Sequence, residues 1–228
     1  MGCGLRCCPY CERKASAHVR NRLEQMLGAF RSPVRMLTLT IRNYPAGGLA
    51  DMLKALGEAW DRFRKSSLWR RSAAGAVAVF ECTASEERGW HAHLHVAWDG
   101  KFMPWQKVLA AWQKASRGAG QRVDVRRGSW AQAAAVRYLS KYASKGVQVA
   151  DLPQELVAEF VKAWWRFRTL RSYGSMFKVG IKPLFRDGVR RCPQCGCIGV
   201  PLGSVGIGQQ PEGDQHRMAT GGTGQSGP

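Results

Sequence analysis

Alternation of apolar and polar residues predicts four β-strands between residues 34 and 126. In the segment 34–41, Leu37, Leu39 and Ile41 alternate with two threonines, which is typical of a strand whose faces meet different surroundings. Similar patterns predict strands at 76–83, 91–98 and 122–126. The polar stretch 85–89 between the second and third of these strands favours a tight turn.

Apolar residues at helical spacing predict helices between and around these strands. Met52, Leu53, Leu56, Trp60 and Phe63 lie on one face of a helix expected over 49–69. The same reasoning predicts a basic helix at 13–30 and further helices at 103–115, 130–145 and 152–170.

From residue 34 onward the predicted order is β-α-β-β-α-β, followed by a helix. This order predicts an α+β fold of the ferredoxin- or RRM-like split βαβ kind: a single antiparallel sheet with helices packed on one face. The residues 171–175 after the last helix are interpreted either as a DNA-contacting loop or as ordinary packing. Many functions share this fold, so the fold alone does not decide the activity.

The charge of the chain narrows the class of partner. The 228 residues carry a formal net charge of +19 and a pI of about 10.2, while 45% of them are apolar, which excludes wholesale disorder. No stretch is apolar enough to span a bilayer, and the protein is not expected to bind a membrane. Residues 101–191 hold nineteen Lys and Arg against five Asp and Glu, interleaved with aromatic residues. This pattern favours nucleic acid over an acidic membrane surface.

Seven of the eight cysteines lie in two clusters near the ends of the chain, each with a Cys-Pro-x-Cys pair. Such spacing lets two thiolates reach one Zn²⁺, and the absence of a secretory signal favours reduced or metal-bound cysteines over disulfides. One shared four-cysteine site, two separate sites, and reduced surface cysteines all remain open. His18 is a further candidate ligand of the first cluster, and Cys82 is expected in the core. The clusters consist of Cys3, Cys7, Cys8 and Cys11, and of Cys192, Cys195 and Cys197.

Three histidines at alternate positions form the first candidate site. In a strand, His91, His93 and His95 share one face. Glu81 would face the same way in the preceding strand, roughly opposite His93 if the two strands form a hairpin. Two imidazoles and a carboxylate with open positions suit Mn²⁺ or Mg²⁺, and would also take Zn²⁺ or Ni²⁺. The alternative is a set of surface or structural histidines.

Two tyrosines form the second candidate site. Tyr138 and Tyr142 are four residues apart and share a face of a predicted helix, with Lys141 and Lys145 beside them. Alone, such tyrosines usually belong to a core. Beside lysines and a metal-binding strand they become candidate nucleophiles.

Together these segments resemble the HUH endonucleases. The run 93–96 matches the His-hydrophobe-His motif of that family, 138–142 matches its Tyr-x-x-Lys-Tyr motif, and 36–40 resembles its first motif, an apolar strand with threonines. The cysteine segment 3–11 is similar to the one that precedes the first motif in many plasmid and phage rolling-circle initiators. The resemblance covers roughly residues 3–180, and the paired tyrosines look most like replication initiators of small phages and some transposases.

The resemblance implies a metal site and a covalent mechanism. A metal on Glu81, His93 and His95 would polarise a scissile phosphate, and His91 leaves the choice of ligands open. One tyrosine, here expected to be Tyr142, would attack the phosphorus and leave a 5′-phosphotyrosyl enzyme with a free 3′-OH. Tyr138 would act in the second round and Lys141 would stabilise the phosphate. Further DNA contacts are expected at Lys145, Arg137 and Arg171.

The leading hypothesis is therefore a rolling-circle replication initiator that nicks and joins single-stranded origin DNA in the cytoplasm of a bacterial host. A two-tyrosine transposase and a non-catalytic, zinc-containing DNA-binding regulator are the alternatives. Since no nucleotide-binding P-loop motif occurs, a host helicase and DNA polymerase are the expected partners. The expected domains are a cysteine-rich segment with a basic helix (1–32), the endonuclease domain (33–185), a zinc knuckle (186–201) and a disordered tail (202–228).

Overall fold

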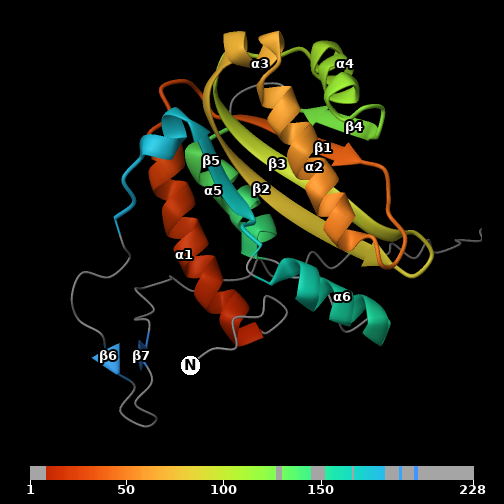
Figure 1. Ribbon diagram of the computed structural model, residues 1–228. Helices are drawn as coiled ribbons and strands as arrows, with labels where there is room; N and C mark the ends of the chain where they lie inside the picture. Colours follow the sequence, from red (N-terminus) through yellow and green to blue (C-terminus); the bar gives the residue numbers. More distant parts are fainter. Residues whose placement is uncertain are drawn as a thin grey trace, which may run out of the picture. The chain divides into compact units, whose positions relative to one another are not determined.

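The computed structural model (Figure 1) describes residues 9–126, 130–144, 152–165, 167–182, 190–191 and 198–199. The chain divides into two compact units, residues 1–187 and 188–228. In order, the first unit contains α1 (Pro9–Gly28), β1 (Arg35–Ile41), α2 (Leu49–Arg64), α3 (Ser67–Ser72), β2 (Ala73–Ser85), β3 (Gly89–Gly100), α4 (Trp105–Ala115), β4 (Gly120–Val125), α5 (Gln132–Ser144), α6 (Gln154–Trp164), β5 (Leu170–Gly174) and the 3₁₀ helix η2 (Ser175–Lys178). In the second unit, β6 (Arg190–Arg191) pairs antiparallel with β7 (Ile198–Gly199).

The predicted α+β fold with an antiparallel sheet is confirmed. The five strands of the first unit have the order β4-β1-β3-β2-β5, and every neighbouring pair is antiparallel. All four predicted strands are present, although β2 and β3 are longer than expected because they form one extended hairpin. The long, central β3 is buried along most of its length, and this hairpin is the rigid support of the candidate site.

One face of the sheet packs against α2, α4 and α6 and holds the larger core. Leu39, Phe80, Leu94 and Trp98 of the strands meet apolar side chains of these helices. Cys82 belongs to this core with 5% exposure, as predicted, and burial raises the pKa of its thiol. Glu159 connects α6 to the start of α2 and to β3. Its carboxylate accepts hydrogen bonds from the backbone N–H groups of residues 47 and 49 and from the indole N–H of Trp90.

The opposite face is also covered, which corrects the expectation of helices on one face only. Helices α1 and α5 pack against each other and against β2 there. The reason is that Met36, Val77, Val79 and Ala97, at one end of the strands, are apolar and need burial on this face as well. The basic helix α1 supplies an apolar stripe consisting of Val19, Leu23, Met26 and Leu27. No described helix, not even the twenty-residue α1, combines the length and apolarity that a membrane crossing needs.

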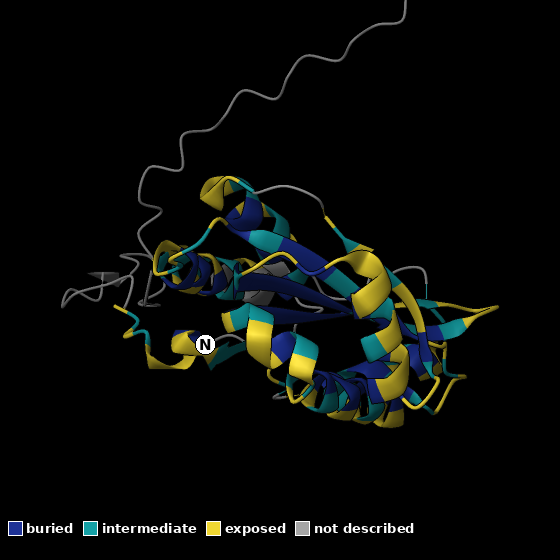
Figure 2. Ribbon diagram, turned by 90° about the horizontal axis from the view of Figure 1, so that it is seen from above, coloured by how far each residue is buried: buried dark blue, intermediate teal, exposed yellow. Residues whose placement is uncertain are grey.

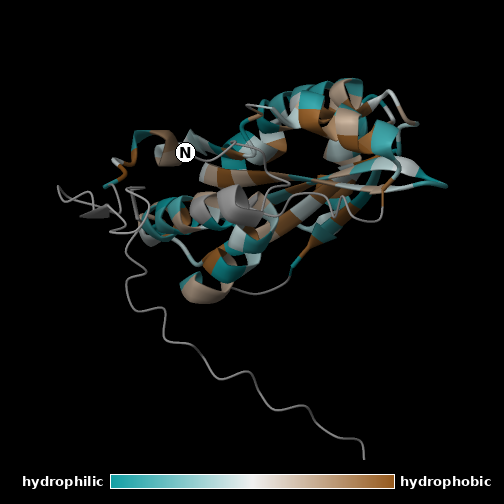
Figure 3. Cartoon of the chain, turned by 90° about the horizontal axis from the view of Figure 1, so that it is seen from below, coloured by the Kyte–Doolittle hydropathy of each residue, from teal (hydrophilic) through white to brown (hydrophobic). Residues whose placement is uncertain are grey.

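The two helical layers leave the sheet strands buried between them, as the dark strands at the centre of Figure 2 show. Polar and apolar residues alternate along the surrounding helices (Figure 3), as expected for helices with one buried face. The sheet therefore has two cores. The candidate site lies on the α1/α5 face, at the strand ends that these helices leave partly open.

The helix predicted over 49–69 is in fact two helices. Helix α2 ends at Arg64, and α3 begins at Ser67 after a turn. Ser66 is the cause of the break, because its backbone is extended and its hydroxyl accepts a hydrogen bond from the Trp69 N–H at 3.2 Å. This is an N-cap, which begins a new helix rather than continuing the old one.

The end of the last predicted helix was wrong. Helix α6 stops at Trp164, and Leu170–Gly174 forms β5, an edge strand paired with β2. Pairing satisfies the backbone groups along the free edge of β2, and Leu170 is buried in the α1/α5 core. Most of the segment 171–175, for which a DNA-contacting loop and ordinary packing were both considered, is thus part of the sheet.

Candidate functional site

The hairpin of β2 and β3 brings the first candidate residues together. Glu81 pairs directly with His93, as the sequence predicted, and His95 follows on the same face. The turn closes at Gly89, whose φ is +64° and whose backbone lies against Tyr44; a Cβ there would be 2.2 Å from the Tyr44 carbonyl oxygen. Glycine is therefore required for the turn that sets this register.

Glu81, His93 and His95 form a group that could hold a metal ion. One ligand atom from each lies within 4.8 Å of the others. Glu81 and His95 are buried, with 7% and 4% exposure, and His95 Nε2 donates to Glu81 Oε2 at 2.9 Å. Burial, and after it the neighbouring His91, lowers the pKa of His93 to about 4, although Glu81 acts in the opposite direction. Neutral imidazoles and a carboxylate are the forms that ligate metals, so these residues fit a divalent cation.

His91 has a different environment. Its Nδ1 donates a hydrogen bond to the side-chain oxygen of Asn43, and its ring meets that of His93 edge to face with 4.4 Å between centroids. Burial, followed by the charge of Arg122, lowers the pKa of His91. Within the described chain, the group of potential ligands that lie close together does not include His91.

Thr38 orients the buried histidine. Its hydroxyl lies 3.2 Å from Nδ1 of His95, on the side of the ring away from Glu81. Both ring nitrogens of His95 thus have a polar partner, and the two contacts orient the ring. The sequence pointed to the strand that contains Thr38 but assigned no role to this residue, and it did not single out Asn43.

Helix α5 places both tyrosines against the same histidine. The Tyr142 ring stacks on His95 with 4.0 Å between centroids and an angle of 19°. Tyr138 meets His95 edge to face, and its hydroxyl lies 3.4 Å from Nδ1. The predicted i, i+4 relation is the reason, because it puts both rings on the helix face that looks onto the sheet.

Both tyrosines are partly buried, and the pKa of Tyr142 is shifted. The Tyr142 ring and that of Tyr138 lie edge to face, 4.9 Å apart. Burial, and after it Tyr138, raises the pKa of Tyr142 to about 12, while Arg126 lowers it. The exposed Lys141 has its ammonium 5.8 Å from the centre of the Tyr142 ring. A phenol whose pKa is raised, an exposed cation and the three potential metal ligands thus lie close together.

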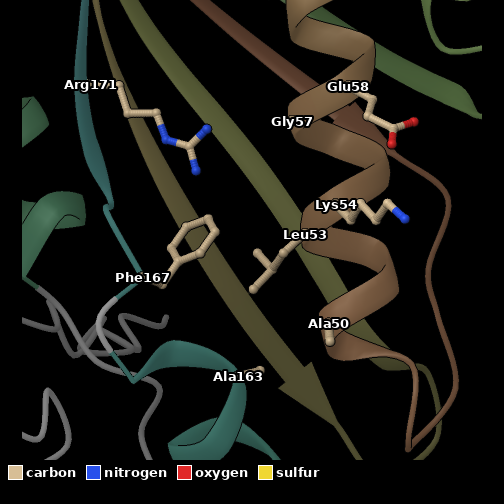
Figure 4. A pocket seen from close by; sticks show the side chains of 8 residues that line it. All are labelled: Ala50, Leu53, Lys54, Gly57, Glu58, Ala163, Phe167 and Arg171. Carbon is tan, nitrogen blue, oxygen red and sulfur yellow. The ribbon is translucent and has the colours of Figure 1, made fainter.

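The expected DNA contacts are not all in one place. Arg137 is exposed on α5, the helix that carries the tyrosines. Arg171 of β5 lies on the other face of the sheet, where its guanidinium stacks over Phe80 and Phe167 at 4.4 and 5.2 Å. There it lines a surface pocket of about 350 Å³ with residues of α2, among them Leu53 and Lys54 (Figure 4). Lys145 lies outside the described residues.

The side chains of the expected zinc ligands are not among those that the structure describes. Cys3, Cys7 and Cys8 precede the described residues, and Cys11 is in α1 without a described side chain. Residues 192–197, which contain the other cluster, are also not described, although β6 and β7 on either side of them pair with each other. The zinc sites remain predictions.

Comparison with known proteins gave one match. A family model described as "Replication protein" matches residues 1–195 of this chain. No curated protein matches the chain, and no solved structure matches it either.

Proposed function

The chain belongs to the replication protein family, and from this premise we propose that it is a rolling-circle initiator of the two-tyrosine HUH type. It would nick and rejoin single-stranded origin DNA in the cytoplasm of a bacterial host, through a 5′-phosphotyrosyl intermediate. One observation carries the proposal: Tyr142 stacks directly on His95, one of three residues that could bind a metal. A nucleophile and an electrophilic centre are thereby side by side.

In the nicking step, each group of site residues has a separate role. A Mn²⁺ or Mg²⁺ ion held by Glu81, His93 and His95 would polarise the scissile phosphate. The Tyr142 oxygen loses its proton and forms a bond to phosphorus, while the bond from phosphorus to the 3′-oxygen breaks and that oxygen takes up a proton. Lys141, close to the Tyr142 ring, stabilises the charge that develops on the phosphate.

Rejoining uses the same site in reverse. The phosphotyrosyl bond conserves the energy of the broken phosphodiester, so joining needs no nucleotide cofactor. Tyr138, also against His95, would attack the regenerated origin, and the released 3′-OH would then attack the first phosphotyrosine and close the circle. A host polymerase would extend the 3′-OH, and a host helicase would unwind the duplex, since these 228 residues contain no P-loop motif.

Formation of a covalent adduct tests the proposal. The full chain is incubated with Mn²⁺ and single-stranded oligonucleotides tiled along both strands of the replicon that encodes it. We expect a protein–DNA adduct that survives denaturation, on one strand and at one site. If no oligonucleotide gives an adduct although the protein is folded, the chain is not a nicking enzyme and the regulator hypothesis takes its place.

We also propose that the cysteine clusters bind structural zinc, on the strength of the two Cys-Pro-x-Cys pairs. Metal analysis of the purified protein and of the variants Cys8→Ser and Cys192→Ser tests this. If one site is shared, each variant loses all of its zinc. If there are two sites, each variant keeps about half of it. Wild-type protein that contains no zinc after purification without chelators would refute the proposal.

A further inference from the structure

The edge strand β4 and the residue that follows it carry a row of charged residues, Arg122, Asp124 and Arg126, on the same face of the sheet as the candidate site. In the described part of the chain, β1 is its only neighbour in the sheet. Val123 and Val125 pack against the α2/α4 core. Because side chains alternate along a strand, Arg122 and Asp124 point to the opposite face, which is the face of the histidines and tyrosines, and Arg126 follows them directly after the strand.

The register places this row beside the metal-ligand group. Thr40 pairs with His93 in β3, and its hydroxyl accepts a hydrogen bond from the Arg122 N–H at 3.1 Å. Thr38 pairs with His95 on one side and with Asp124 on the other. Arg122 and Asp124 are therefore two strand spacings, about 10 Å, from His93 and His95. An extended arginine side chain covers much of that distance.

The two arginines lie at opposite ends of the site. The charge of Arg122 lowers the pKa of His91, and the charge of Arg126 lowers the pKa of Tyr142, so each arginine is near a different residue of the site. They are four residues apart, about 14 Å along the strand direction. Both side chains are exposed, and Arg126 Nε binds Asp124 Oδ2 at 2.8 Å with both partners more than half exposed. Such an ion pair holds its members weakly, so a phosphate can replace the carboxylate.

We propose that the site face of β4 binds the DNA backbone on either side of the scissile phosphate, with Arg122 and Arg126 each contacting a phosphate. This inference rests on the proposed function, because it takes single-stranded DNA as the substrate. Guanidinium groups suit the role, since their planar donors match two phosphate oxygens at once. Asp124 opposes binding through its charge and keeps Arg126 along the strand until DNA arrives.

Salt-dependent binding tests the proposal without requiring cleavage. A labelled single-stranded oligonucleotide is titrated with the full chain at several KCl concentrations, without added Mn²⁺ or Mg²⁺. Each lost phosphate contact should make the slope of log K against log[salt] shallower by about 0.7. We expect this for Arg122→Ala and for Arg126→Ala. Asp124→Asn should instead bind more tightly than wild type, an opposite change that general destabilisation does not produce.

Lys114→Ala is the matched control, because Lys114 is an exposed cation on α4, which covers the other face of the sheet. The slope of log K against log[salt] for Lys114→Ala should equal that of wild type. If an alanine variant fails to fold, Arg122→Gln and Arg126→Gln keep the length of the side chain and carry the same expectation. Unchanged slopes in folded arginine variants, with normal adduct formation by wild type, would overturn the role of β4 and leave the proposed function standing. Wild type that binds no single-stranded DNA would refute both.

Discussion

Replacing Tyr142 with Phe is expected to reduce nicking of the origin strand by roughly a thousandfold or more, the scale of loss when a covalent nucleophile is removed. The substitution deletes only the hydroxyl. The ring that stacks on His95 remains, so the metal-ligand group and the packing of α5 should be unchanged. The measurement is the initial rate of adduct formation on the origin oligonucleotide, under single-turnover conditions with Mn²⁺.

Tyr138 determines what activity is left. Its hydroxyl is also near His95, so a residual adduct in Tyr142→Phe should be linked through Tyr138. The double variant Tyr138→Phe/Tyr142→Phe should form no adduct at all. Tyr44→Phe is the control, because Tyr44 packs against the other core of the sheet. An adduct that persists in the double variant would show that neither tyrosine is the nucleophile.

Replacing Glu81 with Gln is expected to abolish metal-dependent nicking. The change keeps the shape of the side chain and removes the only carboxylate among the three potential ligands. Its effect on Mn²⁺ affinity should exceed the roughly 10- to 100-fold loss typical of changes to the hydrogen-bond partners of ligands. Titration calorimetry with Mn²⁺ and the nicking rate over a range of Mn²⁺ concentrations measure the two effects separately.

Two further variants make this test specific. Glu86→Gln removes an exposed carboxylate in the β2–β3 turn and should bind Mn²⁺ as wild type does. His91→Ala should weaken metal binding much less than His93→Ala, because Asn43 already engages the His91 ring. Wild-type affinity for Mn²⁺ in Glu81→Gln would exclude the carboxylate as a ligand. An equal loss in His91→Ala and His93→Ala would place His91 in the ligand set.

The hairpin of β2 and β3 could be predicted because residues close together in the sequence determine its register and its faces. Alternation in 91–98 puts the histidines on one face, and the polar turn fixes the register that pairs Glu81 with His93. The i, i+4 spacing of Tyr138 and Tyr142 likewise fixes their common face, whatever the rest of the chain does. Short-range geometry was therefore enough to predict which of the candidate side chains share a face.

Contacts between distant segments could not be predicted in the same way. That α1 and α5 cover the site face depends on apolar positions in four strands and a basic helix far apart in sequence. That β5 pairs with β2 depends on a free sheet edge that only the assembled fold creates. Arg122 and Arg126 are an intermediate case, since alternation in the predicted strand 122–126 already put them on one face. Only the strand order shows that this face lies beside the histidines.

Identification of the residue that carries the DNA tests the account most directly. The Mn²⁺-dependent adduct of the wild-type chain is purified under denaturing conditions and digested with nuclease and protease, and the nucleotide-bearing peptide is sequenced by mass spectrometry. The account predicts a 5′-phosphate ester on Tyr142, with Tyr138 as the only alternative. Linkage to any other residue would contradict it.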